Sequence, residues 1–208
     1  MPISDEKLGD FLDRLADRVP APGGGATAAL HAAQGAALLG MVARYTTGEK
    51  YAEHQATVGR IITEVDQLRG IALRLAEADA EAFTAVTDAY QLPKSTLEER
   101  AARSAAIADA LVGAAWPAAQ VISIAGMVVD LAQALMAIGN PNVISDVAAA
   151  AEAARAAAAT ARVNIEINLA GIADEHASLD MIAETGKADD IITRADQVTA
   201  AVRERIRA

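Results

Sequence analysis

Residues 20–27 read P-A-P-G-G-G-A-T and separate two Ala- and Leu-rich runs from one another. The prolines fix φ and remove backbone donors, while the glycines reach backbone conformations closed to other residues. Because Ala26 begins a strongly helix-forming run, Gly23, Gly24 and Gly25 are expected to lie against the free N–H groups of a helix start. Such a start attracts anions and carbonyl oxygens. The alternative is a tight connection between helices, whereas a P-loop is excluded because no Lys-Ser or Lys-Thr follows.

The composition indicates a helical protein with small core side chains. Of the 208 residues, 53% are hydrophobic but only 3% are aromatic, and much of the apolar content is alanine. Alanine buries little area, so long helices and self-association are expected to supply stability. The length fits a single domain over residues 1–208. A formal net charge of −10 disfavours nucleic acid as a partner, because phosphate binding needs a basic face.

Several function classes are disfavoured by what the sequence lacks. It contains no cysteine, which excludes disulfides and Cys-based metal sites, and His31, His54 and His176 show no metal-ligand spacing. We therefore expect no metal. The first residues, M-P-I-S-D-E-K, do not resemble a signal segment, so the cytoplasm is the simplest expectation. The most apolar stretch, residues 117–138, contains Asp130 and two glutamines, which favours a buried helix over a membrane span.

Helical periodicity covers almost the whole chain, and no strand is convincing. Ser4 or Asp5 is expected to cap a first helix whose stripe of leucines and Phe11 docks it onto the core. Pro117 is expected to kink or break a later helix. The expected helices cover residues 4–18, 26–45, 52–90, 95–138, then from after 142 to about 170, and 174–207 with an interruption at 185–187.

Asp79 is the most informative acidic residue. It lies four residues after Leu75 and four before Phe83, which places it on the apolar stripe of its helix. A carboxylate on an inward face either has a partner or has its pKa raised, and both outcomes suit proton transfer. The alternative is a partly exposed aspartate at the edge of the stripe.

A second polar cluster, G-N-P-N-V-I-S-D, covers residues 139–146. It is interpreted either as helix capping by Asn142 or Ser145, or as a second helix start that presents amide, hydroxyl and carboxylate groups together. Asn164 and Asn168 share one helix face at i, i+4 and are able to hold a polar heterocycle or to join helices. Lys50 follows the end of a helix. It is interpreted either as a functional residue or as a solvated cation that interacts with the helix dipole.

The order of these motifs resembles the cyclodeaminase/cyclohydrolase family. The matching segments are P-A-P-G-G-G-A, M-V-A-R-Y-T-T-G-E-K-Y, D-A-E-A-F with L-P-K, G-N-P-N-V-I-S-D and N-I-E-I-N-L. The likeness as a whole extends over about residues 12–169. The family includes the cyclodeaminase domain of formimidoyltransferase-cyclodeaminase and stand-alone methenyltetrahydrofolate cyclohydrolases. One departure is Glu49, which stands where the family often has the first of two lysines and which bears on polyglutamate binding.

The resemblance implies an all-α, mostly up-and-down bundle of long helices that forms a homodimer and binds a reduced folate. Asp79 is expected to transfer protons, with Lys50 or Asp146 orienting water or the leaving amine. No cofactor is expected beyond the tetrahydrofolate derivative that serves as substrate. The residues expected to bind it are Pro22, Gly23, Gly24, Gly25, Asn140, Asn142, Ser145, Asn164 and Asn168.

The leading functional hypothesis is cyclisation of 5-formimidoyltetrahydrofolate to 5,10-methenyltetrahydrofolate with release of ammonia. One alternative is hydrolysis of the methenyl compound to 10-formyltetrahydrofolate, which passes through the same kind of tetrahedral carbon. The others are a different substrate on the same scaffold and a non-catalytic bundle that binds folate or mediates dimer contacts.

Overall fold

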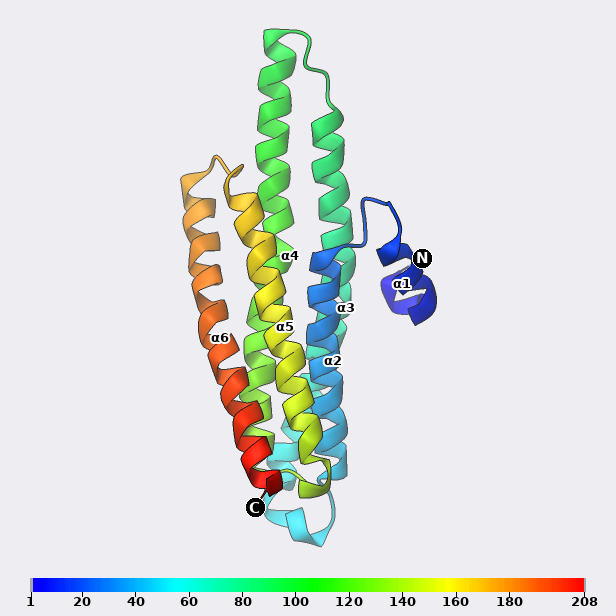
Figure 1. The fold of residues 1–208 in the computed structure, drawn as a ribbon, viewed down its shortest axis with the longest axis vertical. Helices are drawn as coiled ribbons and strands as arrows, with labels where there is room; N and C mark the ends of the chain where they lie inside the picture. Colours follow the sequence, from blue (N-terminus) through cyan, green and yellow to red (C-terminus); the bar gives the residue numbers. More distant parts are fainter. Residues whose placement is uncertain (1, 208) are drawn as a thin grey trace.

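The computed structural model describes residues 2–207, which contain six α-helices and no strand, so the predicted all-α class is confirmed (Figure 1). Three short 3-10 helices, η1 (Ile3–Asp5), η2 (Glu49–His54) and η3 (Pro141–Val143), lie in the connections. The α-helices are α1 (Leu8–Ala16), α2 (Gly24–Tyr45), α3 (Gln55–Gln91), α4 (Leu97–Ile138), α5 (Ile144–Leu169) and α6 (Glu175–Arg207).

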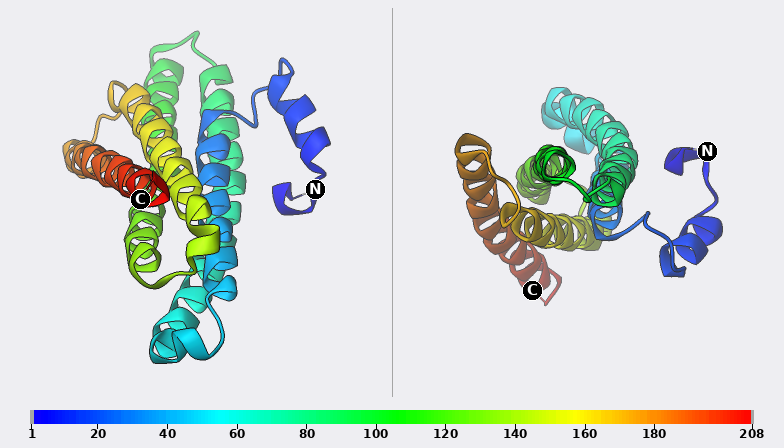
Figure 2. Two further views of the ribbon diagram at one scale, coloured as in Figure 1. Left: turned by 60° about the horizontal axis from the view of Figure 1, so that its bottom comes forward. Right: turned by 90° about the horizontal axis from the view of Figure 1, so that it is seen from above.

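Helices α2 to α6 run along the long axis of the molecule, and each reverses the direction of the one before it (Figures 1 and 2). Helix α2 packs against α3 and α5, and α5 also packs against α4 and α6. This connectivity places the start of α2 beside the second half of α3 and the second half of α5. The end of α2 lies beside the turn between α4 and α5 (Figure 1).

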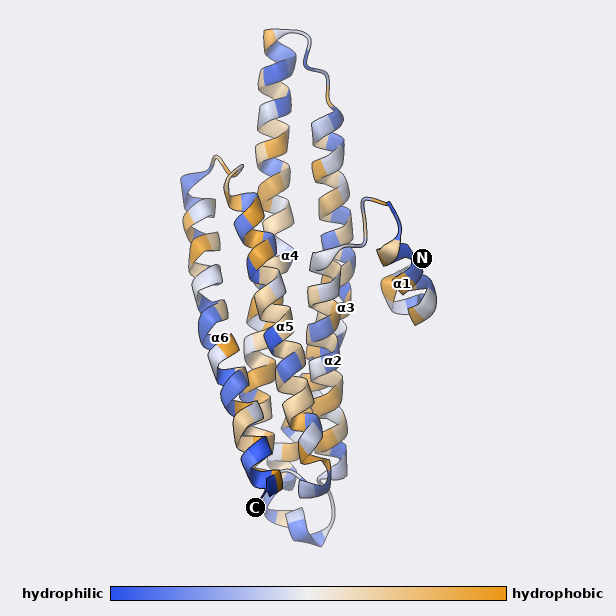
Figure 3. Ribbon diagram, viewed as in Figure 1, coloured by the Kyte–Doolittle hydropathy of each residue, from blue (hydrophilic) through white to orange (hydrophobic). Residues whose placement is uncertain are grey.

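Alanine is the commonest buried residue of both α2 and α5, which pack against each other. Ala29 and Ala36 on α2 and Ala154 and Ala161 on α5 have no exposed surface. Gly35 brings the two backbones still closer, because a Cβ there would lie 3.1 Å from the Ala150 carbonyl oxygen. Larger apolar side chains fill the centre of the bundle, where the ribbon is apolar on most faces (Figure 3). The largest fully buried ones are Leu39, Ile122, Leu135 and Ile165.

Two helices are longer than the sequence predicted. Helix α4 continues through Pro117, although proline removes one helical hydrogen bond and costs about 3 kcal/mol. Pro117 and the alanines after it are buried, so packing of the flanking turns holds the helix together. Helix α6 likewise continues through residues 185–187, where the Thr185 hydroxyl donates to the Ile182 carbonyl over 2.7 Å. The start of α4 is as predicted, with Thr96 and Glu99 forming a capping box.

The first helix forms inside the predicted range, but its predicted cap and docking are wrong. Helix α1 begins at Leu8 without a side-chain cap, and it buries only Phe11. Leu8 is 69% exposed and Leu12 is 50% exposed, so these two leucines do not dock onto the core. The segment stands beside the bundle and is attached through η1, which contacts α3 (Figures 1 and 2).

Helices α2 and α4 are long and apolar enough to cross a membrane. In this fold, however, 61% of the most apolar 18-residue stretch of α2 and 50% of that of α4 are buried inside the bundle. Core helices of bundles share this composition, because they are surrounded by other helices.

Candidate active site

The glycine turn forms the start of α2. Gly23 is the N-terminal flanking residue, and no side chain caps the helix there. Its carbonyl oxygen accepts hydrogen bonds from the Thr27 N–H over 3.1 Å and from the Thr27 hydroxyl over 2.9 Å. The first N–H groups of an α-helix have no partner within the helix, so this start presents free donors and a positive dipole end.

The carboxylate of Asp79 on α3 lies directly against this helix start. A Cβ built on Gly25 would be 1.8 Å from Asp79 Oδ1 and 2.3 Å from Cγ, so only glycine leaves room for the carboxylate. The Ala26 N–H faces the carboxylate and stabilises its charged form. Gly25 and Asp79 are 54 residues apart in sequence, and the up-and-down connectivity brings them together.

Burial raises the pKa of Asp79 above its ordinary value, and the Ala26 N–H opposes this rise only in part. Desolvation disfavours the charged form of a carboxyl group, whereas a donated hydrogen bond favours it. A carboxyl group whose pKa moves toward neutrality is better suited to accept and return a proton near physiological pH.

Two asparagines on α5 complete the polar side of the site. The Asn164 amide nitrogen would lie 3.6 Å from a Cβ on Gly24, so the two residues are neighbours. That nitrogen donates to the Thr160 carbonyl over 2.9 Å, and within residues 2–207 the Asn164 Oδ1 has no hydrogen-bond partner. Asn168 follows one helical turn later on the same face.

These groups surround a cavity of about 170 Å³. Val86 is buried at the cavity wall, whereas Phe83 is 45% exposed and Ile167 is 75% exposed, so both present apolar surface at its edge. Ligand sites usually measure roughly 300–1,000 Å³, so this cavity fits the reacting end of a larger ligand. Its lining consists of Pro20, Ala21, Gly23, Gly24, Gly25, Asp79, Phe83, Val86, Ala114, Asn164, Ile167 and Asn168.

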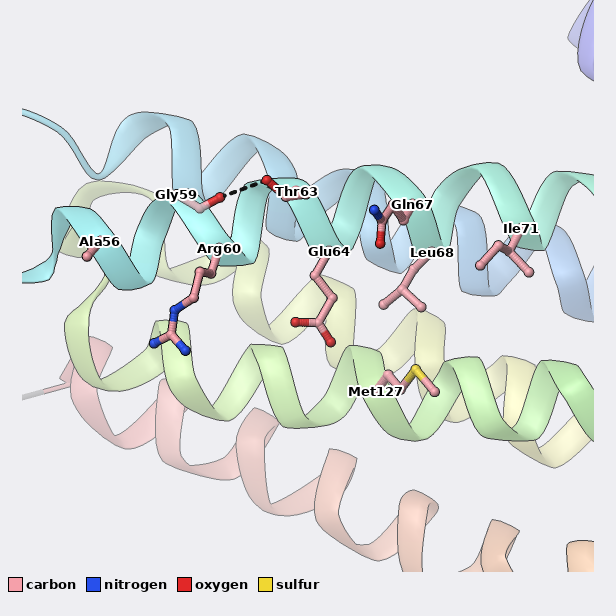
Figure 4. Close-up of a pocket in the computed structure, with 9 residues that line it drawn as sticks. All are labelled: Ala56, Gly59, Arg60, Thr63, Glu64, Gln67, Leu68, Ile71 and Met127. Atoms are coloured by element: carbon pink, nitrogen blue, oxygen red, sulfur yellow. Dashed lines mark hydrogen bonds between the residues drawn. The ribbon is translucent and has the colours of Figure 1, made fainter.

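A wider hollow of about 720 Å³ lies between α3 and α4 (Figure 4). It is an open groove in which Arg60 and Glu64 extend from α3 toward α4, where Met127 forms the opposite side (Figure 4). It contains none of the residues that the sequence singled out. The smaller cavity is therefore the better candidate site, because it combines an inward carboxylate, free helix donors and paired amides.

The remaining predicted site residues lie at the other end of α2. Lys50 is in η2, where its ammonium group lies 5.2 Å from the centre of the Tyr51 ring. Ser145 and Asp146 are in the first turn of α5, next to η3. Helix α2 contains 22 residues, which at 1.5 Å per residue separate its two ends by roughly 30 Å. A single chain does not bring these residues to Asp79 (Figure 1).

Asn140 joins the end of α2 to the turn between α4 and α5. Its amide nitrogen donates to the Tyr45 carbonyl over 2.8 Å, and its amide oxygen accepts from the Asn142 N–H over 3.0 Å. The Asn140 N–H donates to the hydroxyl of buried Thr46 over 3.1 Å. The predicted capping of α5 by Asn142 or Ser145 is wrong, because Val143 precedes the helix and no side chain caps it. Asn140 instead caps η3.

Sequence reasoning missed most of the apolar lining. Pro22 was expected at the site but is buried and does not line the cavity, whereas Pro20 and Ala21 do. Phe83 is one helical turn after Asp79, and Ile167 directly precedes Asn168, so their positions beside predicted polar residues were the available signal. Ala114 carried no signal, since it is one alanine among many.

Known proteins resemble this chain over most of its length. The sequence profile of the family described as formiminotransferase-cyclodeaminase matches residues 7–187. Methenyltetrahydrofolate cyclohydrolase of Methylorubrum extorquens is 40% identical over 171 residues, which cover 82% of each protein. Formimidoyltransferase-cyclodeaminase of Mus musculus is 34% identical over 174 residues, which cover 83% of this chain but only 32% of that longer protein.

A solved structure is similar to the whole fold. The crystal structure of formiminotetrahydrofolate cyclodeaminase from Thermotoga maritima matches with a TM-score of 0.87 and 30% sequence identity. The match covers 99% of this chain and 100% of the other. The arrangement of the helices is therefore shared with that protein.

Proposed function

Because the chain belongs to the formiminotransferase-cyclodeaminase family, we propose that it acts on the one-carbon unit at N5 and N10 of a tetrahydrofolate. The observation that carries the proposal is the Asp79 carboxylate, seated on Gly25 at the start of α2 and facing a cavity with two asparagines. Amides pair with the donors and acceptors of a pterin ring, and the carboxyl group transfers protons at the adjacent carbon.

Water addition to the methenyl carbon is the first form of the reaction. Asp79 takes a proton from the attacking water as the new C–O bond forms, which gives a neutral tetrahedral carbon. The carbon–N5 bond then breaks, Asp79 returns a proton to N5, and the hydroxyl loses its proton as the formyl C=O forms on N10. One proton is released overall. The relative of M. extorquens, which matches over 82% of both chains and is named as a cyclohydrolase, favours this form.

Ammonia release is the second form, and the similarity to the T. maritima cyclodeaminase favours it. Here N10 attacks the formimidoyl carbon and passes its proton to Asp79. Asp79 then protonates the amine, which leaves as ammonia while the methenyl bridge forms. Both forms use one carboxyl group that first accepts and then donates a proton. No step is given to Lys50 or Asp146, since both lie at the far end of α2.

Separate incubation with 5-formimidoyl- and 5,10-methenyltetrahydrofolate tests the proposal, because the methenyl absorbance rises in the first reaction and falls in the second. We expect turnover of at least one compound well above the uncatalysed rate. Absence of turnover with both, together with no saturable heat on calorimetric titration with a reduced folate, would leave a non-catalytic bundle as the better account.

A homodimer is part of the proposal, because exposed apolar side chains lie on α1 and on α4. Leu8 and Leu12 project from α1, while Trp116 and Met127 are 53% and 41% exposed on α4. Association would remove this surface from water. Sedimentation equilibrium measures the state directly, and a monomer at concentrations that support activity would contradict this part.

A further inference from the structure

The candidate cavity has one charged group and no counter-ion. Asp79 is the one titratable side chain among its lining residues, which are otherwise glycines, apolar residues and the two asparagines. Within residues 2–207 no lysine, arginine or histidine forms an ion pair with Asp79. Other acids without an ion pair are exposed or partly exposed to water, whereas the Asp79 carboxylate is largely desolvated at the cavity.

The position of this carboxylate is fixed by its surroundings. Gly25 leaves the space that the carboxylate occupies, and the Ala26 N–H faces it from the start of α2. Burial has cost this carboxylate water contacts that the Ala26 N–H replaces only in part. A cationic ligand group that enters the cavity would restore them, whereas a neutral group would not.

The two substrate forms considered above share one chemical feature. In a protonated formimidoyl group and in a methenyl bridge, a positive charge is delocalised over an N–C–N unit. In 5-formyl- and 10-formyltetrahydrofolate the same carbon carries a neutral C=O. We infer that Asp79 selects for the cationic N–C–N unit, so that the cavity binds amidinium-like folates in preference to neutral formyl folates. This inference rests on the proposed function and adds to it the charge of the group that is recognised.

Charge selection has different consequences for the two forms of the reaction. Hydrolysis converts a cationic unit into a neutral formyl group, so the product loses its ionic partner and leaves more readily. Ammonia release converts one cation into another, so the methenyl product keeps its partner and is retained longer. Asn164 and Asn168 are neutral, so they contribute no ionic attraction to either kind of ligand. Asp79 is therefore the residue that carries the preference.

An isosteric pair of unreactive probes tests the inference. Methylation of N10 removes the proton whose loss cyclisation requires, so 5-formimidoyl-10-methyltetrahydrofolate and 5-formyl-10-methyltetrahydrofolate differ only in C=NH₂⁺ against C=O. Calorimetric titration at neutral pH gives the dissociation constant of each. We expect the cationic probe to bind roughly 10- to 100-fold more tightly, as is typical of a hydrogen bond to a charged partner.

Two variants test whether Asp79 causes the preference for the cationic probe. Asp79→Asn should bring the ratio of the two dissociation constants close to one, while Glu81→Gln should keep the wild-type ratio. Glu81 is an exposed acid on the same helix that lines a different hollow, so this variant removes the same charge without touching the cavity. Circular dichroism confirms that each variant is folded.

The possible outcomes separate the inference from the function on which it rests. Equal binding of the probes to the wild-type protein, with turnover intact, overturns the inference alone. That result would mean that Asp79 pairs with a part of the pterin ring common to both probes. Failure of both probes to bind, with no turnover, overturns the proposed function as well. A preference that persists in Asp79→Asn assigns the selection to another group and also overturns the inference.

Discussion

Both ends of α2 lie beside polar residues, but the hydrogen-bond partners of these residues differ between the two ends. At the start, the Ala26 N–H faces a carboxylate that has no ion-pair partner in the described residues and that lines a cavity. At the end, Thr46, Asn140 and Asn142 hydrogen-bond to each other and to the backbone. Polar groups that satisfy one another stabilise a junction, whereas polar groups left without partners beside a cavity are available to a ligand. The first end therefore has the features of a site and the second those of a structural closure.

Replacement of Asp79 by asparagine is expected to give the largest effect. The variant keeps the shape and the acceptor that faces the Ala26 N–H but cannot transfer a proton, so kcat should fall about 10²- to 10⁴-fold. Steady-state turnover of the methenyl or formimidoyl substrate measures this. Glu81→Gln is the matched control and should retain wild-type kcat. Near-normal turnover in Asp79→Asn would break the distinction between the two ends.

Gly25→Ala sharpens the same distinction by moving the carboxylate without removing it. A Cβ at position 25 would overlap Asp79, so the side chain must shift, and a misplacement of about 1 Å is able to cost roughly 100-fold in rate. Gly186→Ala is the control, because a Cβ there meets nothing within 4 Å and the residue lies on α6, outside the cavity lining. We expect kcat to fall in the first variant, with its pH profile displaced, and to stay unchanged in the second. Wild-type kcat in Gly25→Ala would contradict the placement of the carboxylate.

At the far end, Thr46→Val should lower stability and leave turnover intact. The buried hydroxyl donates to the Val42 carbonyl over 2.8 Å and accepts from the Asn140 N–H, so its loss leaves a buried donor unpaired at a cost of about 1–3 kcal/mol. Denaturant unfolding measures the change. Thr63→Val removes an exposed hydroxyl with the same local bond, to the Gly59 carbonyl, and should cost less. A large loss of kcat in folded Thr46→Val would assign this end to the reaction.

The smallest effect concerns the dependence of stability on pH. Since burial raises the pKa of Asp79, the folded state binds this proton more tightly than the unfolded state. Stability therefore decreases as pH rises from the ordinary value of 3.8 through the raised folded pKa, and it levels off above. Asp79→Asn removes this decrease, so above that range the variant should be more stable, by about 1 kcal/mol or less. Unfolding free energies of both proteins between about pH 4 and 8 test this, and a pH-independent difference would contradict it.

The sequence was sufficient to predict the class of fold, because apolar spacing and alanine content predict long helices. The stripe from Leu75 to Phe83 offered both an inward and a partly exposed Asp79, and in the structure this residue is half-buried while Phe83 is 45% exposed. The stability of α4 through Pro117 was not predictable in this way, because it depends on packing of neighbouring helices. Nor was the exposure of α1, since a stripe of leucines indicates that a helix packs but not against which surface.

The grouping of site residues was predicted only in part. Lys50 and Asp146 were placed with Asp79 from the order of motifs along the chain, yet order does not give distance. In a bundle whose helices alternate in direction, the end of α2 lies beside the start of α5 (Figure 1). Gly25, Asp79 and Asn164 instead line one cavity at the start of α2. The direction of each helix thus determines which motifs lie close together, and the order of the motifs along the chain does not give it.

The alanine contact between α2 and α5 has a further consequence for how firmly the site is held. Alanine has no side-chain rotamers to lose on folding, so this contact costs little conformational entropy and leaves few alternative packings. Gly24 and Asn164 sit at the end of that contact, beside the cavity. The backbone that carries the helix donors and the backbone that carries the amides are thereby joined as one rigid unit. Ligand binding therefore has little backbone left to order at this place.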